Sequence, residues 1–377
     1  MRDMSFMDKL LDGVAVEWKA LGDVVSLQRG KRLIKSQLEE VGRYAVFQNS
    51  MTPLGYYHES NVKADTAFVI AAGAAGEVGY SGVEFWAADD VYFCLPSADI
   101  NQKYLYHFLL MKKNEILSQV RRASIPRLPK TVVEKLKIPI PSPQNPENSL
   151  AIQAEIVRIL DAFTELTTEL TTELTTRKKQ YNYYRDQLLS FEDGEVEWKT
   201  LGEVAEIGTG SHDTQDAIED GDYIFYARGR EPLRLNVFDF DETAIITAGD
   251  GAGVGKVFHY AQGKYALHQR AYRIVPSKVM EPRFVYHCIA SYFYAYIQKA
   301  SVSSSVTSLR RPMFLNFPIP VPSLAEQARI VSILDKFDAL TSSISEGLPR
   351  EIELRQKQYE YYRDLLLSFP KSEEVAA

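Results

Sequence analysis

The first residues that could carry out chemistry are in glycine-rich turns. The run from Gly249 to Lys256, GDGAGVGK, invites comparison with nucleotide-binding loops. No register of it gives G-x-G-x-x-G, and the P-loop spacing fails because Val257 follows the lysine where Ser or Thr is required. The run therefore predicts a tight turn in which glycines adopt positive φ, rather than a nucleotide site.

A second candidate is a repeated Glu-x-Lys pattern, found at Glu17 and Lys19 and again at Glu197 and Lys199. It resembles half of a nuclease carboxylate–lysine motif, but no partner Asp is evident on an adjoining strand. The six histidines show no metal-ligand spacing. Neither an Asn-Pro-Pro-aromatic tetrapeptide nor a methyl-donor glycine motif is present. The sequence thus predicts no catalytic residue and no metal site.

Basic loops are the third and most informative group. Residues 117–132 are rich in Arg and Lys and lack acidic residues, and residues 298–315 place Lys299 and two arginines beside Ser301, Ser303, Ser304 and Ser305, again without acid. Arginine with small hydroxyls suits phosphate contact, and arginine can also bind guanine edges in bidentate fashion. The candidate DNA-contacting residues are Lys31, Arg32, Lys35, Arg121, Arg122, Arg127, Lys130, His212, Arg228, Arg230, Arg270, Arg310 and Arg311.

Internal repeats show which elements must position these loops. Four motifs occur twice in the same order: an opening V-E-W-K-x-L-G-x-V, a closing [IF]-P-I-P, then Q-A-x-I-V-x-I-L-D and Y-x-Y-Y-R-D-x-L-L-S-F. They begin at Val16, Ile138, Gln153 and Tyr181 in the first copy and at Val196, Phe317, Gln327 and Tyr359 in the second. The chain is therefore two copies of one module, and Trp18 and Trp198 of the opening motifs are expected to anchor its cores.

A long helix is predicted over residues 151–191, and inside it Thr164–Thr175 repeats the unit Thr-Glu-Leu-Thr three times. Apolar and aromatic residues alternate there at spacings of four and three, which is the seam of a coiled coil. An antiparallel pair of such helices would bury both seams. The predicted pairing and partner-binding residues are Leu160, Phe163, Leu166, Leu170, Leu174, Tyr181, Tyr184, Leu334, Phe337, Tyr359 and Tyr362.

The second long helix differs from the first. It is longer by four residues between matching Asp and Tyr positions, 24 against 20. Gly347 and Pro349 predict a kink or break in it. Residues 1–13 resemble the tail of such a helix without its front, which predicts that the two halves close cyclically about a pseudo-twofold axis.

The variable regions, about 25–137 and 205–316, share a mixed α/β pattern. In each, a strand enters a glycine-rich turn, and the alignment of Phe68–Gly79 with Ala244–Gly255 matches Gly73 to Gly249. Alternating strands, an aromatic-rich helix (104–117 and 283–298) and a basic loop follow. The rows of tyrosines near the ends of the long helices are expected to be exposed surfaces that need a partner.

Composition limits the remaining classes of protein. The chain has 377 residues, 45% hydrophobic and 25% charged, as in ordinary soluble proteins of two or more domains. The start has no secretory signal and no apolar run is long enough for a membrane helix. Two lone cysteines fit a reducing cytoplasm, which is the predicted location. The net charge of −7 argues only mildly against nucleic acid, because local charge decides binding.

Taken together, the four duplicated motifs resemble the specificity subunit of type I restriction-modification enzymes, and the four-residue units resemble the IC subgroup in particular. The resemblance spans nearly the whole chain. It implies two globular target recognition domains of α/β (α+β) class, separated by two long antiparallel helices that form a coiled coil. The implied domains are residues 1–148, with a short N-terminal helix, and 193–322. The implied helices are 149–192 and 323–370, and 371–377 would be a disordered tail.

The resemblance also implies the partners and where catalysis occurs. Each recognition domain would read one half of a bipartite asymmetric sequence in double-stranded DNA, and the helices would dock two methyltransferase subunits, which restriction subunits join. This chain would be non-catalytic and without cofactor, because S-adenosylmethionine, ATP and Mg would belong to the partners.

Two other classes compete with this interpretation. A coiled-coil scaffold that organises proteins without reading DNA is disfavoured by the acid-free arginine loops. An enzyme with a cryptic site, a nuclease or a methyltransferase, is disfavoured by the missing motifs. Sequence-specific methylation by the chain together with a methyltransferase, but not by the chain alone, would separate the three.

Overall fold

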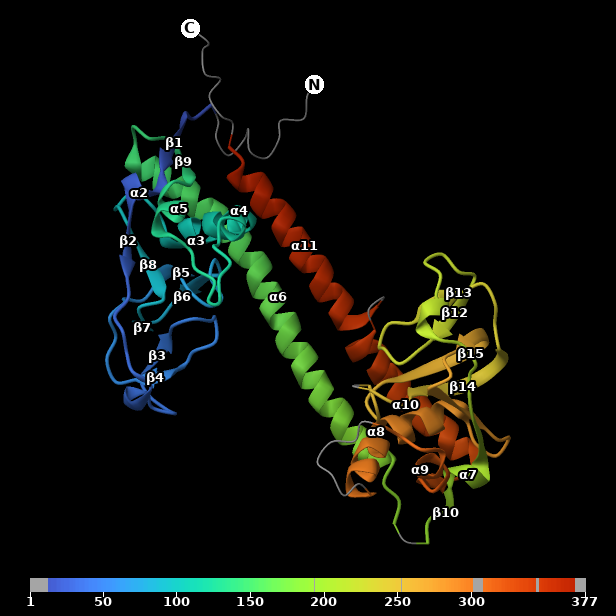
Figure 1. Cartoon of the computed structure of the whole chain (residues 1–377). Coiled ribbons are helices and arrows are strands. Elements are labelled where there is room, and N and C mark those ends of the chain that lie inside the picture. The colour runs from blue at the N-terminus through green and yellow to red at the C-terminus, as the bar shows by residue number, and fades with distance from the viewer. Residues whose placement is uncertain (1–12, 193, 252, 301–307, 344–345, 370–377) are drawn as a thin grey trace. The chain divides into compact units, whose positions relative to one another are not determined.

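A computed structural model describes residues 13–192, 194–251, 253–300, 308–343 and 346–369 (Figure 1). The chain divides into two compact units. The first comprises Met1–Thr171 and Glu351–Ala377, and the second comprises Thr172–Arg350. The predicted N-terminal helix tail and C-terminal tail lie outside the described residues.

The first unit is a mixed α/β domain built on two sheets and a separate strand pair. A four-stranded sheet has the order β2-β8-β5-β6, and a three-stranded sheet has the order β4-β3-β7. The strands are β1 (Val16–Ala20), β2 (Val25–Arg29), β3 (Tyr44–Phe47), β4 (Gly55–Tyr57), β5 (Thr66–Ile70), β6 (Val78–Ser81), β7 (Trp86–Ala87), β8 (Val91–Pro96) and β9 (Lys137–Pro141). The helices are α2 (Leu21–Val24), η1 (Lys35–Gln37), α3 (Gln102–Met111), α4 (Lys113–Ser118) and α5 (Lys130–Glu134). Every residue of β5 is buried, and α3 packs on β5 and β6.

The second unit repeats this plan around one larger sheet with the order β11-β16-β14-β15-β12-β13. Its strands are β10 (Glu197–Thr200), β11 (Ala205–Thr209), β12 (Tyr223–Tyr226), β13 (Leu233–Leu235), β14 (Phe240–Ala248), β15 (Phe258–Leu267), β16 (Ala271–Pro276) and β17 (Pro318–Val321). Its helices are α7 (Leu201–Val204), η2 (Thr214–Asp216), α8 (Pro282–Ala300), α9 (Arg311–Leu315) and α10 (Leu324–Ser342). Helix α8 packs on β14, β15 and β16, as α3 does on its sheet.

The duplicated opening and closing motifs pair with each other. Strand β1 runs antiparallel to β9, with Trp18 opposite Pro139, and β10 runs antiparallel to β17, with Trp198 opposite Pro320. Each pair joins the start of one α/β domain to its end. Trp18 is half-buried against the core of the first unit, but Trp198 is 48% exposed, so the prediction that it anchors a core was wrong.

Helix α6 (Pro146–Leu188) is one continuous 43-residue helix. Proline stands only at its first position and glycine is absent from it, which explains why it runs without a break despite many threonines. The matching C-terminal region is two helices, because α10 ends at Ser342 and α11 (Gly347–Leu367) begins at the glycine that was expected to interrupt it. Gly347 has φ +74°, which other residues rarely adopt.

The repeated glutamine of the long helices joins each one to its domain. Gln153 is fully buried, accepts a hydrogen bond from the Asn101 N–H (2.8 Å) and donates to the Asp99 carbonyl (2.9 Å). Gln327 accepts from the Glu281 N–H (2.7 Å) in the same way. Each glutamine thus satisfies main-chain groups at the start of α3 or α8.

The glycine turns match in a different register from the one expected. The Ala71 N–H donates to the Asp90 carbonyl (2.7 Å), and the Gly249 N–H donates to the Arg270 carbonyl (2.8 Å). Gly249 is therefore the counterpart of Ala71 and not of Gly73. The alignment of Gly73 with Gly249 was wrong by two residues, because the extra length of the second turn shifts the sequence match.

Candidate nucleic-acid interface

In the first unit, main-chain hydrogen bonds tie the arginine loop to the glycine turn. The Arg121 N–H donates to the Arg127 carbonyl over 2.9 Å, and the Arg127 N–H donates back to the Arg121 carbonyl over 3.1 Å. The loop then joins the turn, because the Leu128 N–H donates to the Ala71 carbonyl over 2.8 Å. The backbone of this loop is fixed while its arginine side chains remain exposed.

The second unit ties the equivalent segments together in the same way. The Leu309 N–H donates to the Gly249 carbonyl over 2.7 Å, and Asp250 forms an antiparallel bridge with Ser308. Leu309 and Gly249 thus repeat the bond between Leu128 and Ala71. Residues 301–307, which contain the predicted serines, lie outside the described part of the loop.

A hollow opens beside the tied loops in each unit. Tyr92 and Tyr272 hold the same place in the two hollows, because Tyr92 pairs with Val69 across β8 and β5 and Tyr272 pairs with Thr247 across β16 and β14. The residues that line the first hollow include Arg29, Asp90, Tyr92, Arg121 and Arg127, and those that line the second include Thr209, Asp250, Arg270, Tyr272 and Ser308. The two domains therefore present different polar side chains on one shared frame.

Most of the sequence-predicted DNA-contacting residues are exposed in the structure. The exposed ones are Lys31, Arg32, Lys35, Arg121, Arg122, Arg127, Lys130, Arg230, Arg270, Arg310 and Arg311. Arg228 and His212 are half-buried. In the described part of the chain, Arg121, Arg122 and Arg127 form no ion pair, so their guanidinium groups remain available to a ligand.

Four of these predicted residues are held by carboxylates instead. Lys130 pairs with Glu134 (2.9 Å), one turn further along α5, and the His212 Nε2 lies 3.1 Å from an Asp239 oxygen. Arg228 and Arg270 both pair with Asp250. Asp239 and Asp250 come from other segments of the chain, which a count along one loop does not include.

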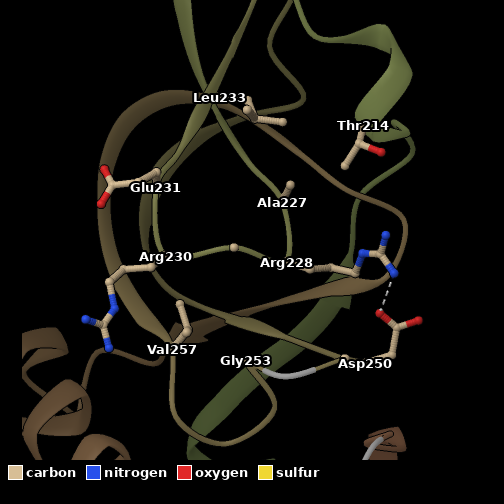
Figure 2. Close-up of a pocket in the computed structure, with 11 residues that line it drawn as sticks. Thr214, Ala227, Arg228, Arg230, Glu231, Leu233, Asp250, Gly253 and Val257 are labelled. Atoms are coloured by element: carbon tan, nitrogen blue, oxygen red, sulfur yellow. Dashed lines mark hydrogen bonds and ion pairs between the residues drawn. The ribbon is translucent and has the colours of Figure 1, made fainter. Parts of the chain in front are cut away.

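Asp250 binds two arginines at once. The Arg228 Nη1 donates to one carboxylate oxygen over 3.1 Å, and the Arg270 Nη1 donates to the other over 3.0 Å. Figure 2 shows the Arg228 side chain directed at Asp250 at the edge of a cavity whose volume is about 600 Å³. Partial burial acts to raise the pKa of the Asp250 carboxyl, but the hydrogen bonds and charges of the two arginines outweigh it and lower this pKa. The carboxylate is therefore charged at neutral pH.

The arrangement suits the recognition of an anionic, hydrogen-bonding ligand. A guanidinium presents five N–H donors in a fixed fork, so an arginine that uses one donor on Asp250 keeps others for phosphate or base-edge acceptors. Backbone-tied loops with exposed arginines on rigid strand ends hold these donors at defined positions. Double-stranded DNA offers both acceptor types.

A second pair of equivalent clusters, which the sequence analysis missed, holds each aromatic helix to its long helix. In the first unit, His107 lies between Asp161 (Nε2 to Oδ1, 3.1 Å) and the Tyr359 hydroxyl (Nδ1, 2.8 Å), and Lys103 also pairs with Asp161. Burial lowers the pKa of His107 more than Asp161 raises it.

In the second unit, Asp335 accepts from His287 (2.7 Å) and from Arg283 (2.8 Å). A repeated pattern of basic residue, aromatic, apolar residue, Tyr and His, which starts at Lys103 and Arg283, was the signal that could have revealed both clusters. These residues hold helices α3 and α8 against the long helices.

Within each unit, the long helices meet through aromatic contacts. In the first unit, Phe163 stacks on Tyr362 with ring centroids 5.2 Å apart. In the second, Phe337 of α10 lies against Tyr181 and Tyr184 at 6.2 and 5.7 Å. Along the predicted seam, Leu160, Leu334 and Ile156 are buried, and Leu166, Leu170, Leu174 and Tyr359 are half-buried.

The tyrosine rows are only partly exposed. Tyr183, Tyr184 and Tyr361 are 63%, 46% and 65% exposed, but Tyr181, Tyr359 and Tyr362 are half-buried. The expectation that all of them are exposed was therefore wrong, because Tyr181, Tyr359 and Tyr362 pack within their own units.

No group of His, Cys, Asp and Glu among the described residues could hold a metal ion. Both cysteines are buried, and burial raises the pKa of Cys94 to about 12, which leaves its thiol unreactive. Among the described residues, no helix is both long and apolar enough to cross a membrane.

The family model "Type I restriction modification DNA specificity domain" matches the chain twice, at residues 14–177 and 194–354. The chain is 40% identical over its full length to the full-length "Type I restriction enzyme EcoR124I/EcoR124II specificity subunit" of Escherichia coli. It is also 32% identical, over 97% of its length and 98% of the relative's, to a putative type I restriction enzyme specificity subunit of Haemophilus influenzae.

Solved structures share the fold. The crystal structure of a type I restriction-modification S subunit from M. genitalium superposes with a TM-score of 0.67 at 17% identity, covering 96% of this chain and 98% of that one. A second solved structure, from a study of complex assembly and conformational transition of the type I R-M system, is also similar. Its TM-score is 0.57 at 13% identity. The match covers 93% of this chain and 97% of that one.

Proposed function

Since the chain belongs to the family of type I restriction-modification DNA specificity domains and is a specificity subunit with two target recognition domains, we propose that each domain reads one half of a bipartite asymmetric DNA site. Reading would occur at the tied glycine and arginine loops. The intact site would require both halves in one duplex at a fixed separation.

The observation that supports this most is the duplicated loop frame with different side chains on it. The bond from Leu128 to Ala71 recurs as the bond from Leu309 to Gly249, while the lining residues differ between the two hollows. A shared frame places both recognition surfaces equivalently, and different side chains let the two half-sites differ, which makes the site asymmetric.

In this proposal the chain is non-catalytic and its helices dock two methyltransferase subunits in the cytoplasm. Restriction subunits then join them, and S-adenosylmethionine, ATP and Mg are bound by these partners. The exposed Tyr183 and Tyr361, with Leu354 (43% exposed), support docking on the helices, because outward aromatic and apolar side chains are enriched in protein interfaces.

The direct test of DNA reading replaces Arg121 and Arg122 together by alanine. The loop is held by main-chain hydrogen bonds, so the substitution leaves the frame intact and removes only the guanidinium groups. We expect a loss of about 1–3 kcal/mol in recognition of one half-site, with assembly unchanged. The measurement is S-adenosylmethionine-dependent methylation of defined duplexes by the chain combined with its methyltransferase.

Lys63→Ala is the matched control, because this exposed basic residue of the same unit is paired with Glu84 (2.9 Å) and lies outside both the arginine loop and the long helices. It should leave methylation unchanged. Loss of methyltransferase binding in the Arg121 and Arg122 variant would contradict the assignment of this loop to DNA. Partner binding without any DNA selectivity in the unmodified chain would instead establish a protein scaffold.

A further inference from the structure

We infer that Arg228 and Arg270 of the second recognition domain read guanine, and that Asp250 is the positioning residue that holds both guanidinium groups for this task. The inference rests on the proposed function, because it names the base that one recognition domain selects and the side chains that select it. The argument depends on how three separate segments bring these residues together.

The three side chains come from different parts of the sheet. Arg228 follows β12, Asp250 lies in the glycine turn after β14, and Arg270 lies in the tight turn between β15 and β16. Their sequence separation explains why no motif reveals the group. Asp250 lines both the cavity beside Arg228 and the hollow beside Arg270, so it forms the wall between them.

Each arginine has a fixed backbone. The Arg270 N–H donates to Nδ1 of the buried His268 (2.9 Å), and the Arg270 carbonyl accepts from the Gly249 N–H (2.8 Å). At the other arginine, a Cβ on Gly253 would lie 2.8 Å from the Arg228 carbonyl oxygen, so the glycine turn packs directly against it. Because the backbones of both arginines are fixed, the shared carboxylate of Asp250 restricts the freedom that remains in the two side chains.

The side chains are nevertheless accessible to a ligand. The Arg228 side chain is 41% exposed and the Arg270 side chain 63% exposed, whereas Asp250 is 23% exposed beneath them. Each arginine uses one Nη1 proton on Asp250 and keeps its other donors. Two donors on one guanidinium match the O6 and N7 acceptors of guanine in the major groove, a pattern that no other base presents there.

Charge also favours an anionic partner. Two guanidinium groups against one carboxylate leave a local charge of +1, which attracts the duplex, while the two bonds to the carboxylate limit the directions in which the arginines can point. The first domain has Ala72 and Asp90 near the positions of Asp250 and Arg270, by the same main-chain bonds. It therefore lacks this group, and the inference applies to one half-site only.

The test measures base preference in the full chain assembled with its methyltransferase subunit. Methylated sites are selected from a pool of duplexes randomised across both half-sites and are then sequenced. Arg228→Lys and Arg270→Lys keep the charge but remove the fork, so each should lower the preference for guanine at one position of one half-site by roughly 10- to 100-fold. The other half-site should be unchanged.

Asp250→Asn separates positioning from simple structural support. It removes one negative charge without changing the shape of the side chain, so binding to DNA of arbitrary sequence should stay equal or become tighter while guanine preference falls roughly tenfold or more. A variant that is merely misfolded would lose both DNA binding and guanine preference. Asp250→Glu, which keeps the carboxylate, should retain more preference than Asp250→Asn.

Arg329→Lys is the matched control, because Arg329 is also an ion-paired arginine of the second unit but lies on α10, bound to Glu326. It should leave the selected site unchanged. If the unmodified chain selects no site, the proposed function itself fails. If it selects a bipartite site and Arg228→Lys, Arg270→Lys and Asp250→Asn all keep its base preference, the inference about this guanine-reading group is overturned while the proposed function stands.

Discussion

We expect two buried histidines, His107 and His287, to make the stability of each recognition domain fall in acid. Each imidazole is nearly inaccessible and is bonded to an aspartate of a long helix. Burial lowers both pKa values, and the bonded aspartates oppose this only in part. The cationic side chains nearby, Lys103 and Arg363 for His107 and Arg283 for His287, lower them further.

A pKa lower in the folded state than in the unfolded state means that the unfolded chain takes up protons first as pH falls. These histidines therefore contribute stability above the ordinary histidine pKa, and this contribution is lost as pH falls through the lowered value. We expect His107→Gln to show a smaller decrease in the free energy of unfolding between about pH 8 and pH 5 than the unmodified chain. Urea unfolding at a series of pH values measures this free energy for both chains.

His58→Gln is the control for that series, because His58 belongs to the same unit and its side chain is 61% exposed. Its free energy of unfolding should change with pH as that of the unmodified chain does. An equal pH dependence in His107→Gln and the unmodified chain would show that the buried imidazole does not titrate with folding.

At the scale of elements, the glycine turns pack directly on helices α4 and α8. Gly76 has φ +92°, and a Cβ there would lie 2.8 Å from the Leu117 side chain of α4. Gly255 repeats this in the second unit, with φ +65° and the Ile297 side chain of α8 at 2.6 Å. Both turns can therefore pack closely on the aromatic helices only with glycine at this position.

Gly76→Ala should destabilise the first unit by about 1–3 kcal/mol, because the backbone conformation is strained for alanine and the added methyl group meets a neighbour. Gly82→Ala in the same unit should change stability by less than about 1 kcal/mol, since only an Asp65 oxygen at 3.9 Å lies near its added Cβ. The free energies of unfolding of the two variants, measured in urea, give the comparison. Equal losses would contradict this role for the turn.

The sequence predicted the elements well where a periodic or duplicated pattern carried the information. The seam spacing predicted α6, and the doubled motifs predicted two α/β domains with long helices, as the structure and the family relationship confirm. The break at Gly347 followed from residue chemistry alone. These features are local, so a few neighbouring residues determine them.

The details of the site could not be predicted in the same way. The group of Arg228, Asp250 and Arg270 depends on the order β16-β14-β15-β12 within one sheet, which local patterns do not specify. The exposure of Trp198 depends on what packs around its strand pair. The register of the two glycine turns was hidden by an insertion. Long-range pairing determines all three.

At the scale of the whole molecule, the end of the chain completes the first unit. Leu366, Leu367 and Phe369 are buried in the core that contains Leu21 and Ile156, although most of that core comes from the first half of the sequence. The first unit is thus built from two distant stretches, as cyclic closure of the two modules predicts. Helix α6 contributes its first part to this unit and its last part to the other.

The repeated units Thr164–Thr175 lie where α6 passes from one unit to the other. Removing four residues shortens a helix by ~6 Å and rotates it by about 40° beyond a full turn. Neighbouring base pairs are roughly 3.4 Å apart along DNA and rotate by ~35°. By rotation, one unit corresponds to about one base pair of the gap between half-sites, although its length exceeds the rise of one base pair.

The most direct test of the account deletes Thr168–Thr171 and maps every methylated site in a genome for the deleted and unmodified chains, each with its methyltransferase. The account predicts two unchanged half-sites whose separation is shorter by about one base pair. An identical site with an identical gap, or a change in the half-site sequences themselves, would contradict the claim that two independent recognition domains are held apart by the length of this helix.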